Sequence, residues 1–266
     1  YENGNADYIA TAKRWWDDMA GKKLFVTGGV GAVHFDEKFG HDYYLPTDAY
    51  LETCAAVGVG FFSQAMNQLT GDAKYIDAWM DQYTDWVKKN PLDGVERLKA
   101  AGASAAEIAA EQENIRFAWR PMEAGRRLQD LLTEFALTIH SPRFTPRFLN
   151  LFLRTYRQHA DHILHNYSKQ GNHLLFEAQR MLFAGIYFPE FREAAEWRRS
   201  GIEILNREIG EQVYDDGMQY ELDLHYHHES IDIFFKALRM MDANGHRGEF
   251  PAAYLATVAR MIDAYI

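Results

Sequence analysis

Hydrophobic residues recur at intervals of three and four along most of this 266-residue chain. One stretch places the following large apolar side chains on one face of a helix: Tyr75, Ile76, Trp79, Met80, Tyr83, Trp86 and Val87. The same period runs through residues 131–139, 148–163, 174–186, 197–213, 231–241 and 255–262. Pairs that interrupt helices, such as Asn90-Pro91 and Asp216-Gly217, separate these stretches. The pattern predicts an all-α fold of helix hairpins joined by short links.

Two regions depart from this period. Residues 22–45 lack this period. They contain a candidate for a short extended segment at 24–26, followed by a glycine-rich turn at 27–31. Residues 92–113 are rich in Ala and Glu, which predicts either a weaker helix or a long exposed connection. No low-complexity linker is present, so we expect a single domain over residues 1–266. In such a domain we expect the following aromatic and Met side chains to pack together: Phe61, Phe62 and Met66 against Trp79, Tyr83 and Trp86.

Composition limits the class of protein. The chain is 47% hydrophobic and 14% aromatic, enough for a large core or an aromatic sugar-binding cleft. Its one cysteine excludes an intramolecular disulfide and a cysteine-cluster metal site, and fits a cytoplasm or a bacterial periplasm equally well. No apolar run approaches the roughly 18 residues of a membrane span. We therefore expect no membrane segment. Residue 1 opens no charged-then-apolar signal sequence, so we expect that any export signal either has been removed or was never present.

The net charge of −10 argues against nucleic acid as a partner. The charge is unevenly distributed, because eight arginines stand against three acidic residues between Asn114 and Ala160. Most of these arginines are equally consistent with solvated helix faces. Arg120, which follows Trp119, is the exception, since a guanidinium there could hold a carboxylate or sulfate through two hydrogen bonds. The sequence therefore predicts an anion contact at Arg120.

Candidate chemistry lies in Gly171-Asn172-His173 and in the later Tyr226, which His225, His227 and His228 flank. An amide that hydrogen-bonds a carboxylate makes it behave as though neutral, and a phenol or imidazole can then take the proton on the adjacent carbon. These are the groups needed to eliminate across a uronic acid. The spacing alone is not specific, because such pairs occur in many proteins.

Longer sequence segments give a more specific indication of family than these isolated residues. The chain carries these segments in order: Tyr83-Thr-Asp-Trp-Val-Lys-Lys-Asn-Pro91, Phe117-Ala-Trp-Arg-Pro-Met-Glu123, Gly171-Asn-His-Leu-Leu-Phe-Glu-Ala178, Phe188-Pro-Glu-Phe191, Asp216-Gly-Met-Gln-Tyr-Glu221 and His225-Tyr226. They resemble the helical domain of heparinase II/III-like polysaccharide lyases, the heparinase III branch most closely. The resemblance runs from about residue 75 to 245. It implies an incomplete α/α toroid of helix hairpins, with residues 81–266 as the lyase-like part.

The resemblance also implies roles for individual residues. Asn172 would neutralise the substrate carboxylate, and His173 and Tyr226 would complete the catalytic set. The side chains expected to contact substrate are these: Trp119, Arg120, Glu177, His225 and His228. No cofactor and no metal is implied. The implied partner is an anionic uronate polysaccharide such as heparan sulfate, and a natural protein of this kind would be periplasmic or secreted.

The first eighty residues resemble another family. The segments Phe25-Val-Thr-Gly-Gly-Val-Gly31, Glu37-Lys-Phe-Gly40 and Leu45-Pro-Thr-Asp-Ala-Tyr-Leu-Glu-Thr-Cys-Ala55 are similar to the β-L-arabinofuranosidase glycoside hydrolases. In that family a residue like Glu37 is the acid/base, and Glu52 and Cys54 would be zinc ligands. The other ligands are further cysteines, which this chain lacks. Residues 1–80 are therefore expected to form glycosidase-like hairpins in a hybrid or designed toroid.

Two smaller patterns concern local chemistry. His159, His162 and His165 recur at intervals of three, which a metal site would permit, but no carboxylate pair supports one. We expect these histidines to face solvent. Glu177 follows His173 by one helical turn, so it could orient His173 or form an ion pair with Arg180.

Three functions remain open from sequence. The first is β-elimination on a uronate polysaccharide, with limited activity expected because the family's additional histidine comes from a β-sandwich domain beyond Ile266. The second is a chimeric or designed α/α-toroid scaffold without turnover, and the third is arabinofuranosidase-like hydrolysis by Glu37. Nothing in the sequence indicates an oligomeric state.

Overall fold

The computed structural model describes residues 4–25, 30–50 and 53–266, with only the backbone described for Thr53, Cys54, Ala56 and Val57. Its described part is all-α, as predicted, with eleven α-helices and no strand. Isolated bridges join Val33 to Lys38 and Val213 to Gln219. None of the described helices is long and apolar enough to cross a bilayer.

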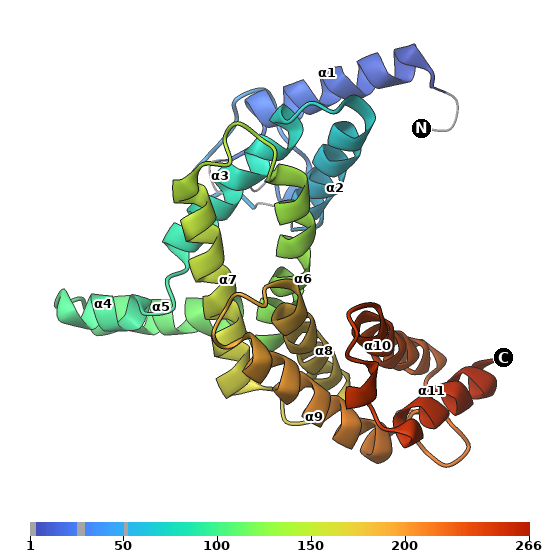
Figure 1. Ribbon diagram of the computed structural model, residues 1–266. Helices are drawn as coiled ribbons and strands as arrows, with labels where there is room; N and C mark the ends of the chain where they lie inside the picture. Colours follow the sequence, from blue (N-terminus) through green and yellow to red (C-terminus); the bar gives the residue numbers. More distant parts are fainter. Residues whose placement is uncertain (1–3, 26–29, 51–52) are drawn as a thin grey trace. The chain divides into compact units, whose positions relative to one another are not determined.

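The chain divides into two compact units (Figure 1). The first unit holds residues 1–91 and 134–152, and the second holds residues 92–133 and 153–266. The division falls at Pro91, a predicted helix breaker, rather than at the junction of the two sequence resemblances. Cooperative unfolding as one domain stays a prediction.

The first unit begins with helices α1 (Ala6–Lys22), α2 (Thr53–Thr70) and α3 (Lys74–Lys89). Asn5 caps α1 by accepting the backbone N–H of Asp7 and Tyr8. Between α1 and α2 the described chain is irregular apart from a short 3₁₀ turn, Phe35–Glu37, which agrees with the missing period there. The sequence expectations for residues 26–29 lie outside the described residues.

Two aromatic clusters form the core of this unit. Trp16, Met66 and Tyr75 are buried together, and the Trp16 indole N–H donates to Ser63 Oγ at 2.9 Å. Tyr83 stacks on Trp79 and meets Phe148 edge to face. Met66 thus packs on Trp16 and Tyr75, which were not among its expected partners, and its expected contacts with Trp79, Tyr83 and Trp86 stay a prediction.

Phe61, the first residue of that expected cluster, is 68% exposed. It lies next to Phe62 in α2, and consecutive helical residues point in different directions, so only Phe62 turns towards the Trp16 cluster.

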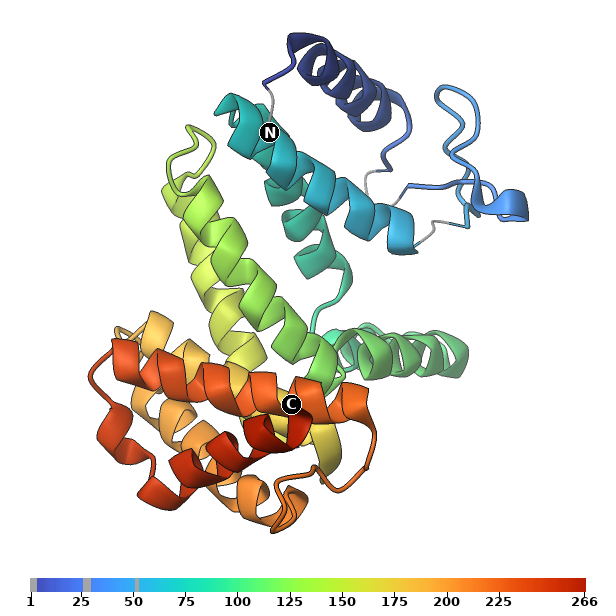
Figure 2. The same ribbon diagram turned by 90° about the vertical axis from the view of Figure 1, so that its right-hand side faces the viewer.

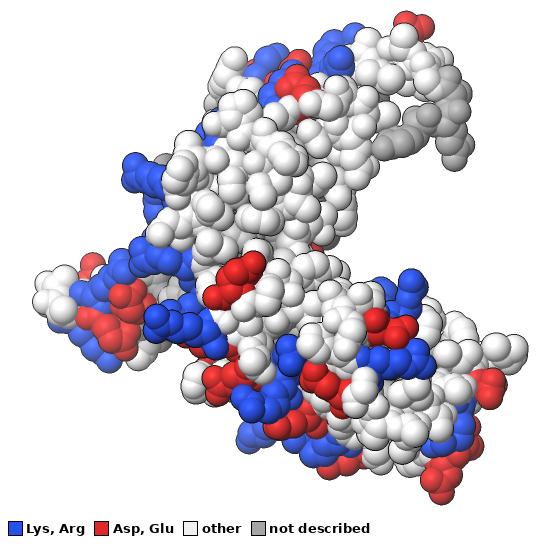
Figure 3. All heavy atoms as spheres, in the orientation of Figure 1, with Lys and Arg blue, Asp and Glu red and all other residues white. Residues whose placement is uncertain are grey.

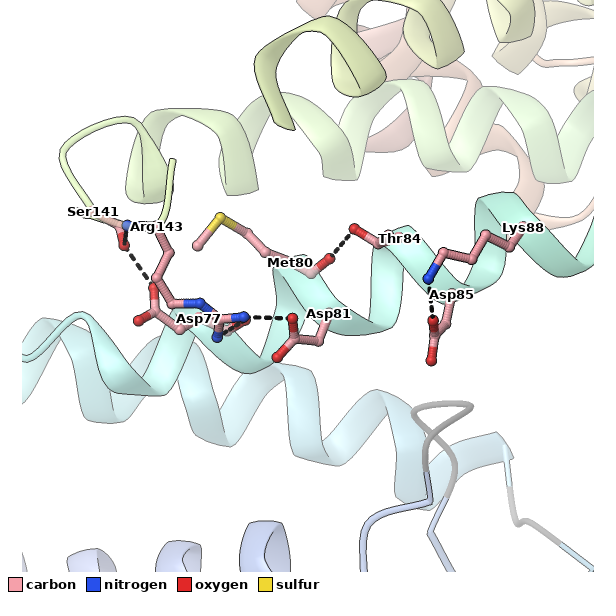
Figure 4. Close-up of polar contacts among 8 residues, drawn as sticks. All are labelled: Asp77, Met80, Asp81, Thr84, Asp85, Lys88, Ser141 and Arg143. Carbon is pink, nitrogen blue, oxygen red and sulfur yellow. Dashed lines mark hydrogen bonds and ion pairs between the residues drawn. The ribbon is translucent and has the colours of Figure 1, made fainter. Parts of the chain in front are cut away.

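Hydrogen bonds join α3 to the loop between α6 and α7 (Figure 4). Ser141 Oγ donates to Asp77 Oδ1 at 2.6 Å, and the backbone N–H of Arg143 donates to Ser141 Oγ at 3.1 Å. The Arg143 guanidinium reaches Asp81 at 2.5 Å. The buried Ser141 hydroxyl thus donates to α3 and accepts from its own loop, and so holds this loop against α3.

The second unit contains most of the remaining helices. Its helices and the two shared with the first unit are α4 (Gly94–Ala100), α5 (Ala105–Ala118), α6 (Pro121–Thr138), α7 (Pro146–Asn166), α8 (Gly171–Tyr187), α9 (Ala194–Gln212), α10 (Leu224–Ala243) and α11 (Ala252–Tyr265). The region 92–113 is thus largely helical, and a capping box of Ser104 and Glu107 begins α5. Figures 1 and 2 show α4 and α5 as a hairpin projecting from the rest of this unit.

The core of the second unit lies among α8, α9, α10 and α11 (Figure 2). Leu175, Leu205, Phe234 and Met261 are each fully buried, one from each helix. Helices α8 and α9 approach closely because Gly201 has no side chain. A Cβ there would lie 2.4 Å from the carbonyl oxygen of Ala178.

Candidate functional site

Three helices, α6, α8 and α10, begin near one another in the second unit. Gly125 of α6 faces Phe176 of α8, and farther along both helices Asp130 interacts electrostatically with Arg180. Gly125 also lies near Arg180, and Arg120, which immediately precedes α6, interacts electrostatically with Glu177 in the second turn of α8, so the start of α6 lies near the start of α8. Their N-terminal ends therefore lie at one end of the unit.

Helix α10 begins at the same end. The side-chain amide of Gln212 approaches the Gly171 carbonyl at 3.4 Å, and the Tyr220 backbone N–H donates to the Gln212 carbonyl at 2.8 Å. The Tyr220 hydroxyl lies 3.6 Å from the position that a Cβ on Gly171 would occupy. Since α10 starts four residues after Tyr220, at Leu224, its first turn lies near the first turn of α8.

These helix starts carry the predicted site residues. Arg120 immediately precedes α6, and its carbonyl accepts the backbone N–H of Ala124. Asn172 and His173 form the first turn of α8, where both are half-buried. Tyr226 lies in the first turn of α10 and is 39% exposed. The structure thus brings Arg120, Asn172 and Tyr226 to one end, while their catalytic and binding roles stay predictions.

The first turn of α8 is suited to an anion. Its N-cap residue Gln170 makes no side-chain capping hydrogen bond. Gly171 has a φ of +79°, the left-handed conformation that favours glycine. Uncapped backbone N–H groups at a helix start attract negative charge. By contrast, the Asp223 carboxylate already caps α10 by accepting from His225 N and Tyr226 N.

Glu177 supports the loop that leads into α8. It is fully buried, and its two carboxylate oxygens accept the backbone N–H and the hydroxyl of Ser168, each at 2.7 Å. Burial raises the pKa of Glu177, while the Ser168 hydrogen bonds and the charge of Arg120 act in the opposite direction. Its hydrogen bonds are thus to Ser168, rather than to His173 or Arg180 as expected. Its role in substrate contact stays a prediction.

The histidines around Tyr226 occupy different environments. His225 and His228 are exposed, and the His228 ring lies 5.5 Å from that of Tyr265 in α11. His227 is fully buried: its Nδ1 accepts from the Gln219 N–H at 3.1 Å, so its Nε2 donates to the Met261 carbonyl at 2.9 Å. His227 therefore holds the start of α10 against α11.

The expectation that the α7 histidines face solvent was wrong for His159. This side chain is fully buried, and its ring packs at a tilt against Trp119 with the centroids 4.5 Å apart. Its Nε2 accepts a hydrogen bond from Arg127 Nε at 2.8 Å. Burial, followed by the Arg127 charge, lowers the pKa of His159 to about 3. Trp119 is itself buried, so its indole packs in the protein, and His162 donates to the Trp119 carbonyl at 2.6 Å.

Sequence reasoning missed Ser168, Gln212 and Tyr220, which position the start of α8. Tyr220 lies in the segment Asp216–Glu221, which resembles the lyase family, so this segment could have indicated its importance. Ser168 and Gln212 are ordinary polar residues whose importance depends on contacts from distant parts of the chain.

The glycosidase-like residues are described only in part. Glu37 is exposed and has a φ of +50°, beside Asp36 at +57°. Glu52 lies outside the described residues, as does the side chain of Cys54. Among the described residues, no cluster of three or more His, Cys, Asp or Glu side chains could hold a metal ion.

Comparison with known proteins distinguishes the two parts of the chain. Residues 61–266 match the heparinase II/III N-terminus family, and residues 1–81 match the catalytic domain of the GH127 β-L-arabinofuranosidases. Heparin-sulfate lyases from Bacteroides stercoris and Pedobacter heparinus are 54% and 48% identical over 198 and 197 residues. Each alignment covers 74% of this chain, but only 30% and 28% of the respective relatives.

The fold agrees with the sequence relationship. A heparinase III structure matches with a TM-score of 0.74 at 45% identity, covering 96% of this chain and 40% of that one. The helices thus match a heparinase helical toroid domain, as the sequence predicted. This chain belongs to the heparinase II/III N-terminus family and spans less than a third of the length of its curated relatives.

Proposed function

We propose that this chain forms the helical part of a polysaccharide lyase that cleaves a uronate polysaccharide, such as heparan sulfate, by β-elimination. The observation that carries the proposal is the common location of Arg120, Asn172 and Tyr226 at the starts of three helices. The names of the relatives, heparin-sulfate lyases, support this substrate class.

The arrangement suits the recognition of a uronate carboxylate. The Asn172 amide and the uncapped N–H groups of α8 can donate hydrogen bonds to it, and the Arg120 guanidinium adds a positive charge at the same end. These donors favour the charge that develops on the carboxylate when the neighbouring carbon loses its proton. Asn172 thereby acts on the acidity of that carbon.

Tyr226 provides a group for proton transfer. In the elimination, the bond between C5 and its proton breaks, a C4–C5 double bond forms, and the C4 oxygen leaves as an alcohol after gaining a proton. The half-exposed Tyr226 ring can reach a bound sugar, and the His225 ring lies 5.7 Å from it. We assign proton transfer to Tyr226 and the orientation of the sugar or the phenol to His225.

Digestion of heparan sulfate tests this proposal through the ultraviolet absorbance of the unsaturated uronyl product. A neutral polysaccharide serves as the control substrate, and a chain extended by a relative's β-sandwich domain shows whether such a domain is needed. Absence of unsaturated product from both proteins would contradict the lyase assignment.

A scaffold without turnover is the second candidate. It is supported by the match of residues 1–81 to a different enzyme family, which is consistent with a hybrid origin. Binding of heparan sulfate without product would favour this scaffold. Zinc-dependent cleavage of an aryl arabinofuranoside, lost on Glu37→Gln, would instead favour the hydrolase.

A further inference from the structure

Two cavities of the second unit meet along α7. The first, about 450 Å³, follows α7 from Arg154 to Asn166. The second, about 550 Å³, lies among the end of α5, the start of α6 and the end of α7. His162 and Asn166 line both, so the two depressions adjoin at the end of α7, and we call them together the α7 groove.

The α7 groove is basic although the chain as a whole is acidic. Arg116, Arg120, Arg154 and Arg157 line it, and Asp161 is its only acidic lining residue among those described. Figure 3 shows Lys and Arg interspersed with Asp and Glu over the lower part of the visible face.

The arginines differ in their availability. Arg157 forms ion pairs with Asp161 and Glu193, and Arg116 pairs with Glu113 of the same helix. Arg154 is exposed and has no ion-pair partner within 4.0 Å among the described residues. Arg154 therefore provides a guanidinium that can bind a sulfate or carboxylate through two hydrogen bonds.

An exposed aromatic ring adds a sugar-binding element. Phe117 lines the second cavity and is 61% exposed, and the Arg116 guanidinium lies 4.6 Å from its ring centroid. The apolar face of a pyranose can cover such a ring while its anionic substituents contact the arginine. Residues 154–166 of α7 span about 18 Å at the helical rise, long enough for several monosaccharides.

We propose that the α7 groove is an accessory binding site for the same anionic polysaccharide, extending from Arg120 at the candidate catalytic end to Arg154. The identity of this ligand rests on the proposed function. Long chains would occupy both the catalytic end and the groove, whereas short chains would occupy only the former. Arg116, Phe117 and Arg154 would thus raise affinity in proportion to chain length.

The test compares oligosaccharides of two lengths. Heparin tetrasaccharide and dodecasaccharide are titrated by calorimetry into a Tyr226→Phe protein, which keeps the ligand intact. Arg116→Ala with Arg154→Ala should weaken dodecasaccharide binding by about tenfold, as expected for two partly exposed charge contacts. Tetrasaccharide binding should change by less than about twofold. The loss should shrink at high salt, because screening weakens the contacts that the variant removes.

Control variants separate this effect from general charge and from misfolding. Arg260→Ala removes an exposed arginine of α11 outside the groove and should leave both affinities unchanged. Alanine favours helix at positions 116 and 154, so an unchanged thermal midpoint is expected. Arg154→Glu alone should weaken dodecasaccharide binding and provides a second variant if the double substitution unfolds.

Each outcome decides between the two proposals. Unchanged dodecasaccharide affinity in both groove variants, or equal losses for both lengths, would overturn the accessory groove. A length-dependent loss in a protein that yields no unsaturated product would support the groove while contradicting the lyase assignment.

Discussion

The side-chain nitrogen of Gln179 in α8 donates a hydrogen bond to the carbonyl oxygen of Ile233 in α10 at 2.6 Å. Gln179 is 1% exposed, so this bond forms away from water between the two helices whose first turns carry Asn172 and Tyr226. This hydrogen bond joins the middles of α8 and α10. It therefore helps to hold in place the two helices that carry Asn172 and Tyr226.

Replacing Gln179 by Leu should lower the free energy of unfolding by about 1–3 kcal/mol, because the buried hydrogen bond is lost. Urea denaturation measures this change. Gln129→Leu, at an exposed position of α6, is the matched control and should change stability by less than about 0.5 kcal/mol. Equal effects of the two substitutions would show that the α8–α10 contact contributes little.

Two glycines of α9 should respond in opposite directions to alanine. A Cβ on Gly201 would lie 2.4 Å from the Ala178 carbonyl oxygen and 2.8 Å from Leu182 N, so Gly201→Ala should cost at least about 1–3 kcal/mol. Gly210 has no neighbour within 4 Å of its Cβ position, so Gly210→Ala should stabilise by about 0.5–1 kcal/mol. Thermal unfolding of both variants checks the contrast, and a stable Gly201→Ala protein would contradict the close helix packing.

Stability should fall at acidic pH because of His159. Its folded pKa is lowered to about 3, whereas an unfolded histidine has a pKa of about 6.5. The unfolded state therefore binds the proton first, and stability is lost as the pH falls from about 6.5 towards 3. The expected slope is about 1.4 kcal/mol per pH unit within that window.

Unfolding titrations at several pH values measure this slope. His159→Gln should be less stable at pH 7, because the contacts with Arg127 and Thr155 change, and should lose less stability on acidification. The same pH dependence in both proteins would assign the acid sensitivity to other groups.

The buried hydroxyl of Ser141 should matter more than the exposed ion pair beside it (Figure 4). Ser141→Ala removes a hydrogen bond to Asp77 and an acceptor for Arg143 N, with an expected loss of about 1–2 kcal/mol. Asp81→Ala breaks the exposed contact with Arg143 and should cost less than about 1 kcal/mol. Chemical denaturation of both variants measures the two losses of stability. A larger loss for Asp81→Ala than for Ser141→Ala would show that the ion pair contributes more than the hydroxyl.

If the chain is active, Tyr226→Phe should abolish product formation while substrate affinity stays within about twofold, because only the hydroxyl is lost. Asn172→Ala should lower turnover by about 10²–10³, the range for removal of one donor to a developing anion. Product absorbance gives turnover and calorimetry gives affinity. Full activity of Tyr226→Phe would exclude the phenol as the proton-transfer group.

The sequence by itself determined the helical class and the family. The three-and-four period predicted the stretches that became α7, α8 and α10, because side-chain burial on one helix face leaves a local pattern. The segment around Asn172 identified the relationship to lyases, because a contiguous stretch of sequence can be recognised without knowing its tertiary contacts. The predicted helical stretch 231–241 did not include Tyr226, and only the structure places this residue in the first turn of α10, which begins at Leu224.

Only the tertiary structure decided what surrounds these residues. The burial of His159 depends on Trp119 and Arg127, and the hydrogen bonds of Glu177 depend on a loop that folds back onto α8. Periodicity reports which face of a helix is apolar, but it does not report which other helix covers that face or in which direction that helix runs. The common end shared by Arg120, Asn172 and Tyr226 therefore follows from contacts between distant segments, which no local pattern encodes.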